Sequence, residues 1–231
     1  MLEELKKKLE SYELEYKKKV DGLYYWSSSL FFSAGLGFCA LCDYYDCDII
    51  IDSGTGKFGL STEIFAKCFP NKKIITIDTH SYYHNEKIIK DRLKIYNNIE
   101  FIKGNSADVI PLLLGKLEDK KICIMYDGPK GKQAYDLFQI HRKNKNVVFA
   151  SFDDCGNHNE YTKKSYEVML NTHEVLFWSD EKWFNDKYGY LDKNRYFVNE
   201  NSDINSPKYY KEHPYSDKYP RGTGTCFIIN K

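Results

Sequence analysis

The stretch that most restricts the fold of this chain is residues 48–62, where the sequence reads DIIIDSGTGKFGLST. A short apolar run ends in Asp52, and glycines follow at positions 54, 56 and 59. This is the order of a strand, a Gly-x-Gly-x-x-Gly turn and the start of a helix, which builds a cradle for a nucleotide. Gly54 and Gly56 let the backbone turn tightly and approach a ligand, and Gly59 lets the helix pack near the strand. The turn alone does not identify the nucleotide.

Length and charge narrow the class of protein. At 231 residues the chain is long enough for one domain with a substantial core. Lys and Arg number 34 against 33 Asp and Glu, so charge gives no reason to expect nucleic acid or a membrane as a partner. Lys and Glu dominate the first twenty residues, which are therefore not a secretory leader. We expect a cytoplasmic protein.

Seven cysteines lie at positions 39, 42, 47, 68, 123, 155 and 226. The odd number, with Cys123 inside an apolar run, predicts reduced thiols. Cys39-x-x-Cys42 with Cys47 nearby could indicate zinc, but no second Cys/His pair at finger spacing follows. A structural metal is thus the weaker interpretation.

Residues 22–42 carry no charge and raise the question of a membrane span. Serines and glycines interrupt this stretch, so a buried helix beside a cofactor pocket is the preferred interpretation and a span the alternative. Before it, apolar residues at spacings of three and four predict an amphipathic helix over residues 1–20. That helix either packs on the domain or serves as a short arm of a homodimer. We expect N-terminal helices over 1–47 and the main domain over 48–231.

From residue 48 onward, strand-like and helix-like segments alternate. Strands are expected at 48–52, 73–78, 99–103, 121–126, 146–152, 174–178 and 225–230, and helices at 59–69, 84–96, 106–115 and 131–142. The strands are near-continuous apolar runs, which is typical of a parallel sheet covered on both faces. The sequence therefore predicts a single α/β, Rossmann-like, doubly wound domain. Its sheet has seven strands, mostly parallel, with helices on both faces and an antiparallel C-terminal strand.

Acidic residues stand at the ends of these strands. Asp52, Asp78 and Asp127 end the first, second and fourth strands, and Asp153 and Asp154 follow the fifth. Ligands of open parallel sheets bind at the carboxyl ends of the strands, so these acids indicate a site.

Asp78 lies 24 residues after Gly54, where a carboxylate accepts hydrogen bonds from ribose hydroxyls in both nicotinamide and S-adenosylmethionine enzymes. A short-chain dehydrogenase needs a Tyr-x-x-x-Lys pair late in the domain. The only match near the core, Tyr83 to Lys87, comes too early. The final strand, read from GTGTCFIIN, suits the extra antiparallel strand of methyltransferase sheets.

Three segments in order carry a family resemblance: DSGTGKFG, Asp78 at the end of the second strand, and GNSADVIP after the third. Over residues 27–231 the chain resembles class I S-adenosylmethionine-dependent methyltransferases, in particular the metal-dependent O-methyltransferases of the catechol, caffeoyl-coenzyme A and macrocin sugar types. The resemblance implies S-adenosylmethionine as cofactor. It implies contacts to that cofactor from Asp52, Ser53, Gly54, Gly56, Gly59, Ser61, Asp78, Thr79, Asn105, Ser106, Ala107 and Asp127.

The resemblance also implies a divalent cation, Mg²⁺ or Mn²⁺, held by Asp127, Asp153 and Asp154. Three converging carboxylates independently require protons or a cation, and hard oxygen ligands favour magnesium, calcium or manganese. In the mechanism that follows, the metal lowers the pKa of a substrate hydroxyl. Lys130, Asp127 or His158 then removes its proton before attack on the methyl group. A helix cap or solvated loop acids are the structural alternatives for these residues.

The sequence says less about the acceptor molecule than about the cofactor and the metal. We expect the segment from about 179 to 224 to be a lid or acceptor segment, and it is rich in aromatic residues. Together with one residue at the end of the preceding strand, these are Trp178, Trp183, Phe184, Tyr188, Tyr190 and Tyr196. They are either platforms for a sugar or aromatic acceptor, or ordinary packing. The adjacent Asp153 and Asp154 resemble the macrocin sugar type more than the catechol type, which usually has Asn second. With the aromatic residues, this resemblance favours a sugar or glycan hydroxyl over a catechol or other phenol. A non-catalytic cofactor-binding protein and a nicotinamide oxidoreductase are the rival functions.

Overall fold

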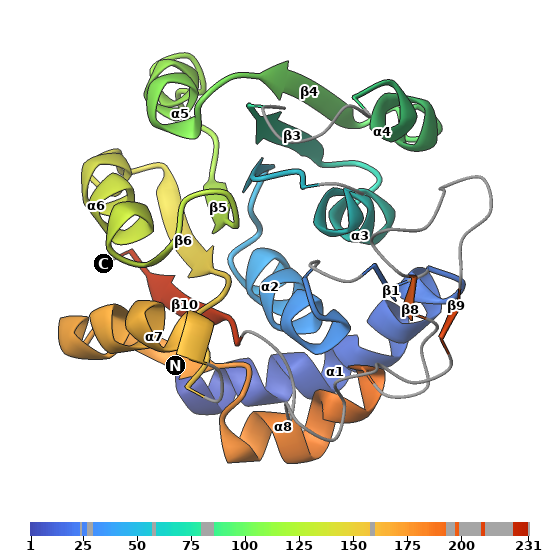
Figure 1. Ribbon diagram of the computed structural model, residues 1–231, viewed down its shortest axis with the longest axis vertical. Coiled ribbons are helices and arrows are strands. Elements are labelled where there is room, and N and C mark those ends of the chain that lie inside the picture. The colour runs from blue at the N-terminus through green and yellow to red at the C-terminus, as the bar shows by residue number, and fades with distance from the viewer. Residues whose placement is uncertain are drawn as a thin grey trace.

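The computed structural model describes residues 1–23, 25–26, 30–56, 59–79, 86–157, 160–192, 197–198, 209–210 and 224–230. Its centre is a seven-stranded sheet flanked by helices (Figure 1). The strands are β2 (Ile49–Ser53), β3 (Lys73–Asp78), β4 (Ile99–Lys103), β5 (Ile122–Tyr126), β6 (Val147–Phe152), β7 (Val175–Trp178) and β10 (Cys226–Ile229). The helices are α1 (Leu2–Val20), α2 (Phe32–Tyr44), α3 (Leu60–Cys68), α4 (Glu86–Leu93), α5 (Ser106–Leu114), α6 (Gly131–His141), α7 (Glu160–Thr172) and α8 (Lys182–Tyr188), with the 3-10 helix η1 (Gly189–Asp192).

The strands are arranged in the order β4-β3-β2-β5-β6-β10-β7. β2 pairs in parallel with β3 and β5, whereas β10 runs antiparallel to both β6 and β7. The chain order therefore reverses between β2 and β5, and such a switch point is where open sheets bind ligands. This arrangement confirms the predicted fold class, including the antiparallel C-terminal strand.

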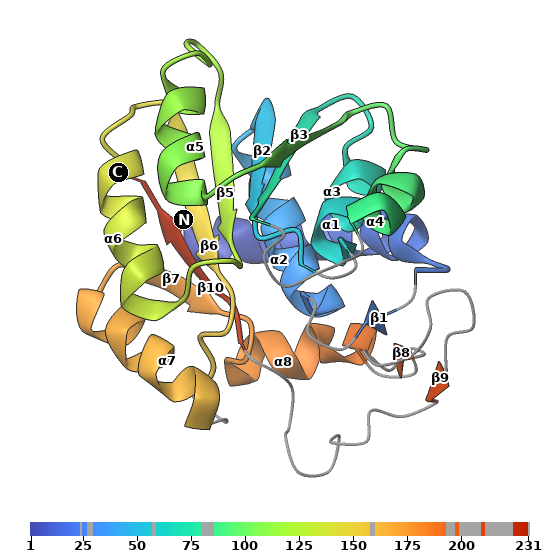
Figure 2. The same ribbon diagram turned by 45° about the horizontal axis from the view of Figure 1, so that its top comes forward.

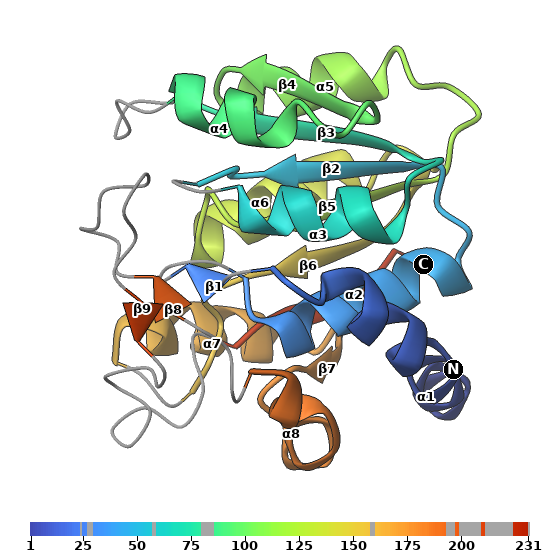
Figure 3. The same ribbon diagram turned by 90° about the vertical axis from the view of Figure 1, so that its right-hand side faces the viewer.

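Alternate residues of each central strand face opposite sides of the sheet and build two apolar layers. Ile50 and Met125 join one layer together with α1, α2, α3 and α8. Ile51 and Ile124 join the other, which α5, α6 and α7 cover. Figures 2 and 3 show these helices on opposite sides of the strands. Because both faces are buried, β5 consists of apolar and aromatic residues, and β2 is apolar until Asp52 and Ser53 at its carboxyl end.

The N-terminal helices belong to the first of these layers. The apolar stripe of α1 is Leu5, Leu9, Tyr12, Tyr16 and Val20, and all five residues are buried within the chain. Eleven of the thirteen residues of α2 are buried, as the uncharged sequence predicts for a core helix. No helix in the described residues is both long and apolar enough to cross a membrane. The homodimer arm stays a prediction.

Most expected elements are present, and their ends match the expected ones or differ by one residue. The helix expected over 84–96 is α4, which ends at Leu93, and its expected start lies outside the described residues. Sequence patterns missed α7 and α8. They also missed a small sheet formed by β1 (Tyr25–Trp26), β8 (Phe197–Val198) and β9 (Tyr209–Tyr210).

The contact between α1 and α2 depends on a glycine. The Tyr16 hydroxyl donates a hydrogen bond to the Phe32 carbonyl oxygen at 2.8 Å. A Cβ atom at Gly35 would collide with that hydroxyl. The missing side chain at position 35 therefore makes room for the tyrosine that anchors α1.

A double-mutant cycle tests this contact. We expect Gly35→Ala to lower the free energy of unfolding by about 1–3 kcal/mol, because the new methyl group overpacks the Tyr16 hydroxyl. Tyr16→Phe alone should cost about 1 kcal/mol for the lost hydrogen bond. In the Tyr16→Phe background Gly35→Ala should be neutral or stabilising by up to about 1 kcal/mol, since alanine favours helix. Strictly additive effects in urea denaturation would contradict the account.

Candidate active site

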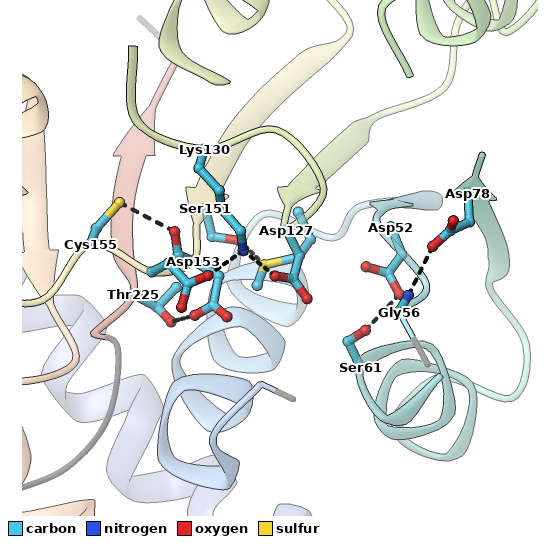
Figure 4. A network of polar contacts seen from close by, with 12 residues as sticks. Asp52, Gly56, Ser61, Asp78, Asp127, Lys130, Ser151, Asp153, Cys155 and Thr225 are labelled. Carbon is cyan, nitrogen blue, oxygen red and sulfur yellow. Dashed lines mark hydrogen bonds and ion pairs between the residues drawn. The ribbon is translucent and has the colours of Figure 1, made fainter. Parts of the chain in front are cut away.

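The carboxyl ends of β2, β3, β5 and β6 meet at one edge of the sheet, where the acids predicted from the sequence gather. In Figure 3 the arrows of β2 and β6 point toward this edge. Figure 4 shows two groups of side chains there: Asp52, Gly56, Ser61 and Asp78 on one side, and Asp127, Lys130 and Asp153 on the other. The first group surrounds the glycine turn, and the second surrounds a cluster of carboxylates.

The glycine turn is pressed against the chain that follows β5. Gly54 has φ +117°, and a Cβ atom there would collide with the backbone nitrogen of Gly128. The backbone amides of Asp127 and Gly128 both donate to the Ser53 carbonyl, at 2.8 and 2.6 Å. Gly54 is thus required by its backbone angle and by a neighbouring loop, and its approach to a ligand stays a prediction.

At Gly56 the glycine turn has open space where a side chain would be. It has φ +64°, and a Cβ atom there would meet no atom of the described residues within 4 Å. Its amide donates to Asp78 Oδ2 at 3.0 Å. Gly59 is the N-cap of α3 with φ +62°, and a Cβ atom there would meet side chains of α4 and of Thr55, which follows β2.

Asp52 is fully buried beneath the turn. Its Oδ2 accepts hydrogen bonds from Ser61 Oγ at 2.8 Å and from Thr62 Oγ1 at 2.6 Å. Its Oδ1 is buried without a hydrogen-bond partner among the described residues. Burial raises the pKa of Asp52 to about 7, although the two hydroxyl hydrogen bonds oppose the shift.

The remaining predicted cofactor residues line the ends of β3 and β4. Asp78 is half-buried and Thr79 beside it is exposed. Asn105 caps α5 by accepting the Ala107 amide at 2.9 Å. Ser106 follows Asn105, and its hydroxyl accepts from Ser53 Oγ at 2.6 Å. The Ser53–Ser106 bond joins the end of β2 to the start of α5, so the glycine turn and the α5 cap form one polar border.

On the other side, Asp127, Asp153 and Asp154 bring carboxylate oxygens within 4.8 Å of one another. Lys130 Nζ lies between two of them, at 2.5 Å from Asp127 Oδ1 and 2.7 Å from Asp154 Oδ2. Asp153 is buried and accepts a hydrogen bond from Thr225 Oγ1 at 2.7 Å. Asp154 adopts φ +56°, which is rare outside glycine and turns it into the cluster.

The charges of this cluster are strongly coupled. Burial raises the pKa of Asp127 and of Asp153, and neighbouring carboxylates raise both further. Burial disfavours the Lys130 ammonium, but Asp127 and Asp154 outweigh it and raise the pKa of Lys130 above its usual range. These contacts favour the protonated form of Lys130.

The outcome differs among the residues that the sequence predicted as catalytic or acceptor-binding. His158 and Tyr196 lie outside the described residues. Phe184 and Tyr188 are fully buried in the core, and the Trp178 ring lies 4.7 Å from the Tyr166 ring at a tilt of 46°. Tyr190 is exposed, and its hydroxyl donates to Glu13 on α1 at 2.5 Å. Phe184 and Tyr188 thus pack the core, whereas Tyr190 lies at the surface beside α1, and the lid or acceptor role of the 179–224 segment stays a prediction.

Sequence patterns missed Thr62 and Thr225 as partners of the buried acids. Thr62 could have been found, because it lies on the first turn of the helix that follows the glycines. Thr225 precedes β10, whose Cys226 pairs with Phe152. Only the antiparallel register of β10 against β6 brings Thr225 beside Asp153.

No protein-family model and no curated protein sequence matches this chain. Solved structures do match. A protein from Klebsiella pneumoniae assigned as an O-methyltransferase aligns at TM-score 0.50 and 12% identity, covering 98% of this chain and 90% of that one. The chain has the Rossmann-like methyltransferase fold.

Two further structures are similar at lower scores. A Staphylococcus aureus protein assigned as a caffeoyl-CoA O-methyltransferase aligns at TM-score 0.45 and 16% identity, covering 84% of this chain and 81% of that one. The SAH-bound methyltransferase PaMTH1 of Podospora anserina aligns at 0.49 and 12%, covering 88% and 80%.

The buried Asp52 predicts a pH-dependent stability. Its folded pKa of about 7 lies above the unfolded value, so between about pH 4 and pH 7 only the folded state keeps the proton. Stability is greatest below this window and falls as the pH rises through it, by up to about 4 kcal/mol. Asp52→Asn cannot ionise. The difference in unfolding free energy between the two proteins should therefore shift in favour of Asp52→Asn from about pH 5 to about pH 8.

Urea denaturation of both proteins at each pH measures this difference. The comparison cancels the titration of Asp127 and Asp153, which both proteins share. A constant difference across the range would show that Asp52 is ionised throughout.

Proposed function

We propose that this chain is an S-adenosylmethionine-dependent O-methyltransferase that transfers a methyl group to a hydroxyl of a sugar or glycan with the help of a divalent cation. One observation carries the proposal: a glycine turn bordered by Asp78 lies beside a carboxylate cluster at the switch point of a methyltransferase sheet. The first part suits a nucleoside, and the second suits an acceptor hydroxyl.

The residues of the glycine turn fit the cofactor. Gly56 leaves open space, and the unpartnered Asp52 Oδ1 offers a buried acceptor beneath the turn. Asp78 would accept hydrogen bonds from the ribose, while Ser106 and Ala107 would border the adenine. S-adenosylmethionine supplies a methyl group on a sulfonium, which a deprotonated oxygen can attack with loss of a neutral thioether. The protein's part is to hold both reactants in line, an effect worth up to about 7–11 kcal/mol.

The carboxylate cluster fits a hard divalent cation. Three oxygen donors converge, and the Lys130 ammonium among them is a stand-in for a positive ion. A bound Mg²⁺ or Mn²⁺ would lower the pKa of an acceptor hydroxyl. Lys130 can accept a proton only if Asp127 and Asp154 turn their charge to another cation, because their present contacts keep the amine protonated. Asp127 itself is the second candidate base.

For the acceptor, the adjacent pair Asp153 and Asp154 supports a sugar or glycan hydroxyl. Phe184 and Tyr188 give no further support, since the fold uses them as core packing. A phenolic hydroxyl is the alternative that an acceptor panel would reveal.

Cofactor binding is the first test. Calorimetric titration with S-adenosylhomocysteine should give micromolar binding. Asp78→Ala should weaken it by about 10- to 150-fold, equal to about 1.5–3 kcal/mol for lost charge-assisted hydrogen bonds. Asp78→Asn, which keeps an acceptor for the Gly56 amide, should lose less.

Asp91→Asn is the matched control, because Asp91 is exposed on α4 and forms a salt bridge with Lys94. Its affinity should equal that of the unmodified protein. Unchanged affinity in Asp78→Ala would put the ribose elsewhere, and no binding by the unmodified chain would exclude the proposed function.

Metal dependence is the second test. With methyl-labelled S-adenosylmethionine and Mg²⁺, label should pass to a member of a panel of sugars, glycans and phenols. Asp153→Ala should abolish transfer yet keep its affinity for S-adenosylhomocysteine. Mn²⁺ binding, followed by electron paramagnetic resonance, should weaken at least about 10- to 100-fold in Asp154→Asn.

Lys130→Met should instead tighten Mn²⁺ binding, since the competing ammonium is gone. Asp136→Asn, an exposed position on α6, is the control. Transfer that survives Asp153→Ala, or Mn²⁺ binding indifferent to both Asp154→Asn and Lys130→Met, would contradict the metal-assisted mechanism.

A further inference from the structure

A second cluster of potential ligands lies at the opposite edge of the sheet. Cys42 is in the last turn of α2, Cys47 is in the turn before β2, and Cys123 is near the start of β5. All three side chains are fully buried, and their sulfur atoms lie within 4.8 Å of one another. β2 runs from this cluster toward the candidate active site, so the two sites occupy different ends of the same strand.

The sulfur geometry fits a metal ion. An ion bound to three sulfurs at about 2.3 Å in a plane puts them about 4.0 Å apart, within the observed limit. No fourth Cys, His, Asp or Glu of the described residues joins the group. Structural zinc is almost always four-coordinate, so three sulfurs with no fourth such side chain among the described residues favour a softer ion. Cu(I) is such an ion.

Two lysines border the cluster. Lys72 Nζ donates to the Cys47 carbonyl at 2.7 Å, and Lys121 Nζ donates to the Tyr45 carbonyl at 3.1 Å. A buried group of thiolates with one monovalent ion carries negative charge, which costs free energy unless cations lie nearby. The two ammonium groups lower this cost, although Lys72 also forms a salt bridge with Asp46 at 3.0 Å.

We propose that Cys42, Cys47 and Cys123 bind one Cu(I) ion in a three-coordinate thiolate site. The ion joins α2, the turn before β2, and β5. On binding, each ligating thiol releases its proton to solvent and forms a sulfur–copper bond, with no change of oxidation state. Cys39-x-x-Cys42, the pair that stands out in the sequence, is not the ligand set, because the Cys39 thiol contacts Cys68 instead.

The other cysteines provide matched controls. Cys39 lies with Cys68, and Cys155 lies with Cys226; all four are buried, in pairs and not in a group of three. They are buried thiols like the proposed ligands, but they form pairs instead of a group of three. A serine at one of these positions tests whether any buried thiol would have the same effect.

The experiment is an anaerobic titration of the reduced, full chain with Cu(I) in competition with bathocuproine disulfonate. One ion should bind per chain, and Cys47→Ser, a change in a turn, should lose that tight equivalent. Cys39→Ser and Cys155→Ser should keep it. Circular dichroism and the affinity for S-adenosylhomocysteine should stay unchanged in Cys47→Ser, which shows that the loss is local.

X-ray absorption of the unmodified copper-loaded chain gives a readout that needs no variant. It should report three sulfur neighbours at about 2.3 Å and no nitrogen or oxygen. Full Cu(I) binding in Cys47→Ser, equal loss in Cys39→Ser, or a sulfur count other than three would overturn the proposal. Displacement of Cu(I) by equimolar Zn²⁺ would overturn the choice of ion.

Discussion

The candidate site depends on one backbone contact, the approach of Gly54 to Gly128. Two amides from the chain after β5 share the Ser53 carbonyl, and only a residue without Cβ fits in the space that remains. This contact sets the glycine turn of β2 against the loop that carries Asp127 and Lys130. A cofactor on the turn and an acceptor near the carboxylates would thereby be held at a fixed separation. Transfer between two bound molecules requires such a separation.

Electrostatics gives the second constraint. Asp52, Asp127 and Asp153 are acids whose pKa is raised mainly by burial, and one lysine lies among the carboxylates of the cluster. A fold gains no stability from gathering acids in this way, because ionised carboxylates repel one another and lose hydration. The arrangement has a physical reason if this edge of the sheet binds ligands. Lys130 then balances part of the charge when no other cation is bound.

Sequence patterns could predict the sheet because its strands are apolar runs and each acid follows one of them. The antiparallel β10 was also predictable, from an apolar run at the end of a methyltransferase-like order. The missed helix α7 shows the limit: its buried positions include Thr162 and Ser165 beside Met169, so its core face is too polar to give an apolar period. The burial of Phe184 and Tyr188, and the position of the Lys130 amine, depend on packing between distant segments. One sequence does not encode that packing as a local pattern.

The most direct test of the central claim is a crystal structure of the chain with S-adenosylhomocysteine and Mn²⁺, using the anomalous signal of manganese. The account predicts the nucleoside over Gly56 with its ribose at Asp78. It also predicts a manganese peak among Asp127, Asp153 and Asp154, with the Lys130 amine moved away. A nucleoside bound elsewhere, or no manganese peak with Lys130 still between Asp127 and Asp154, would contradict it.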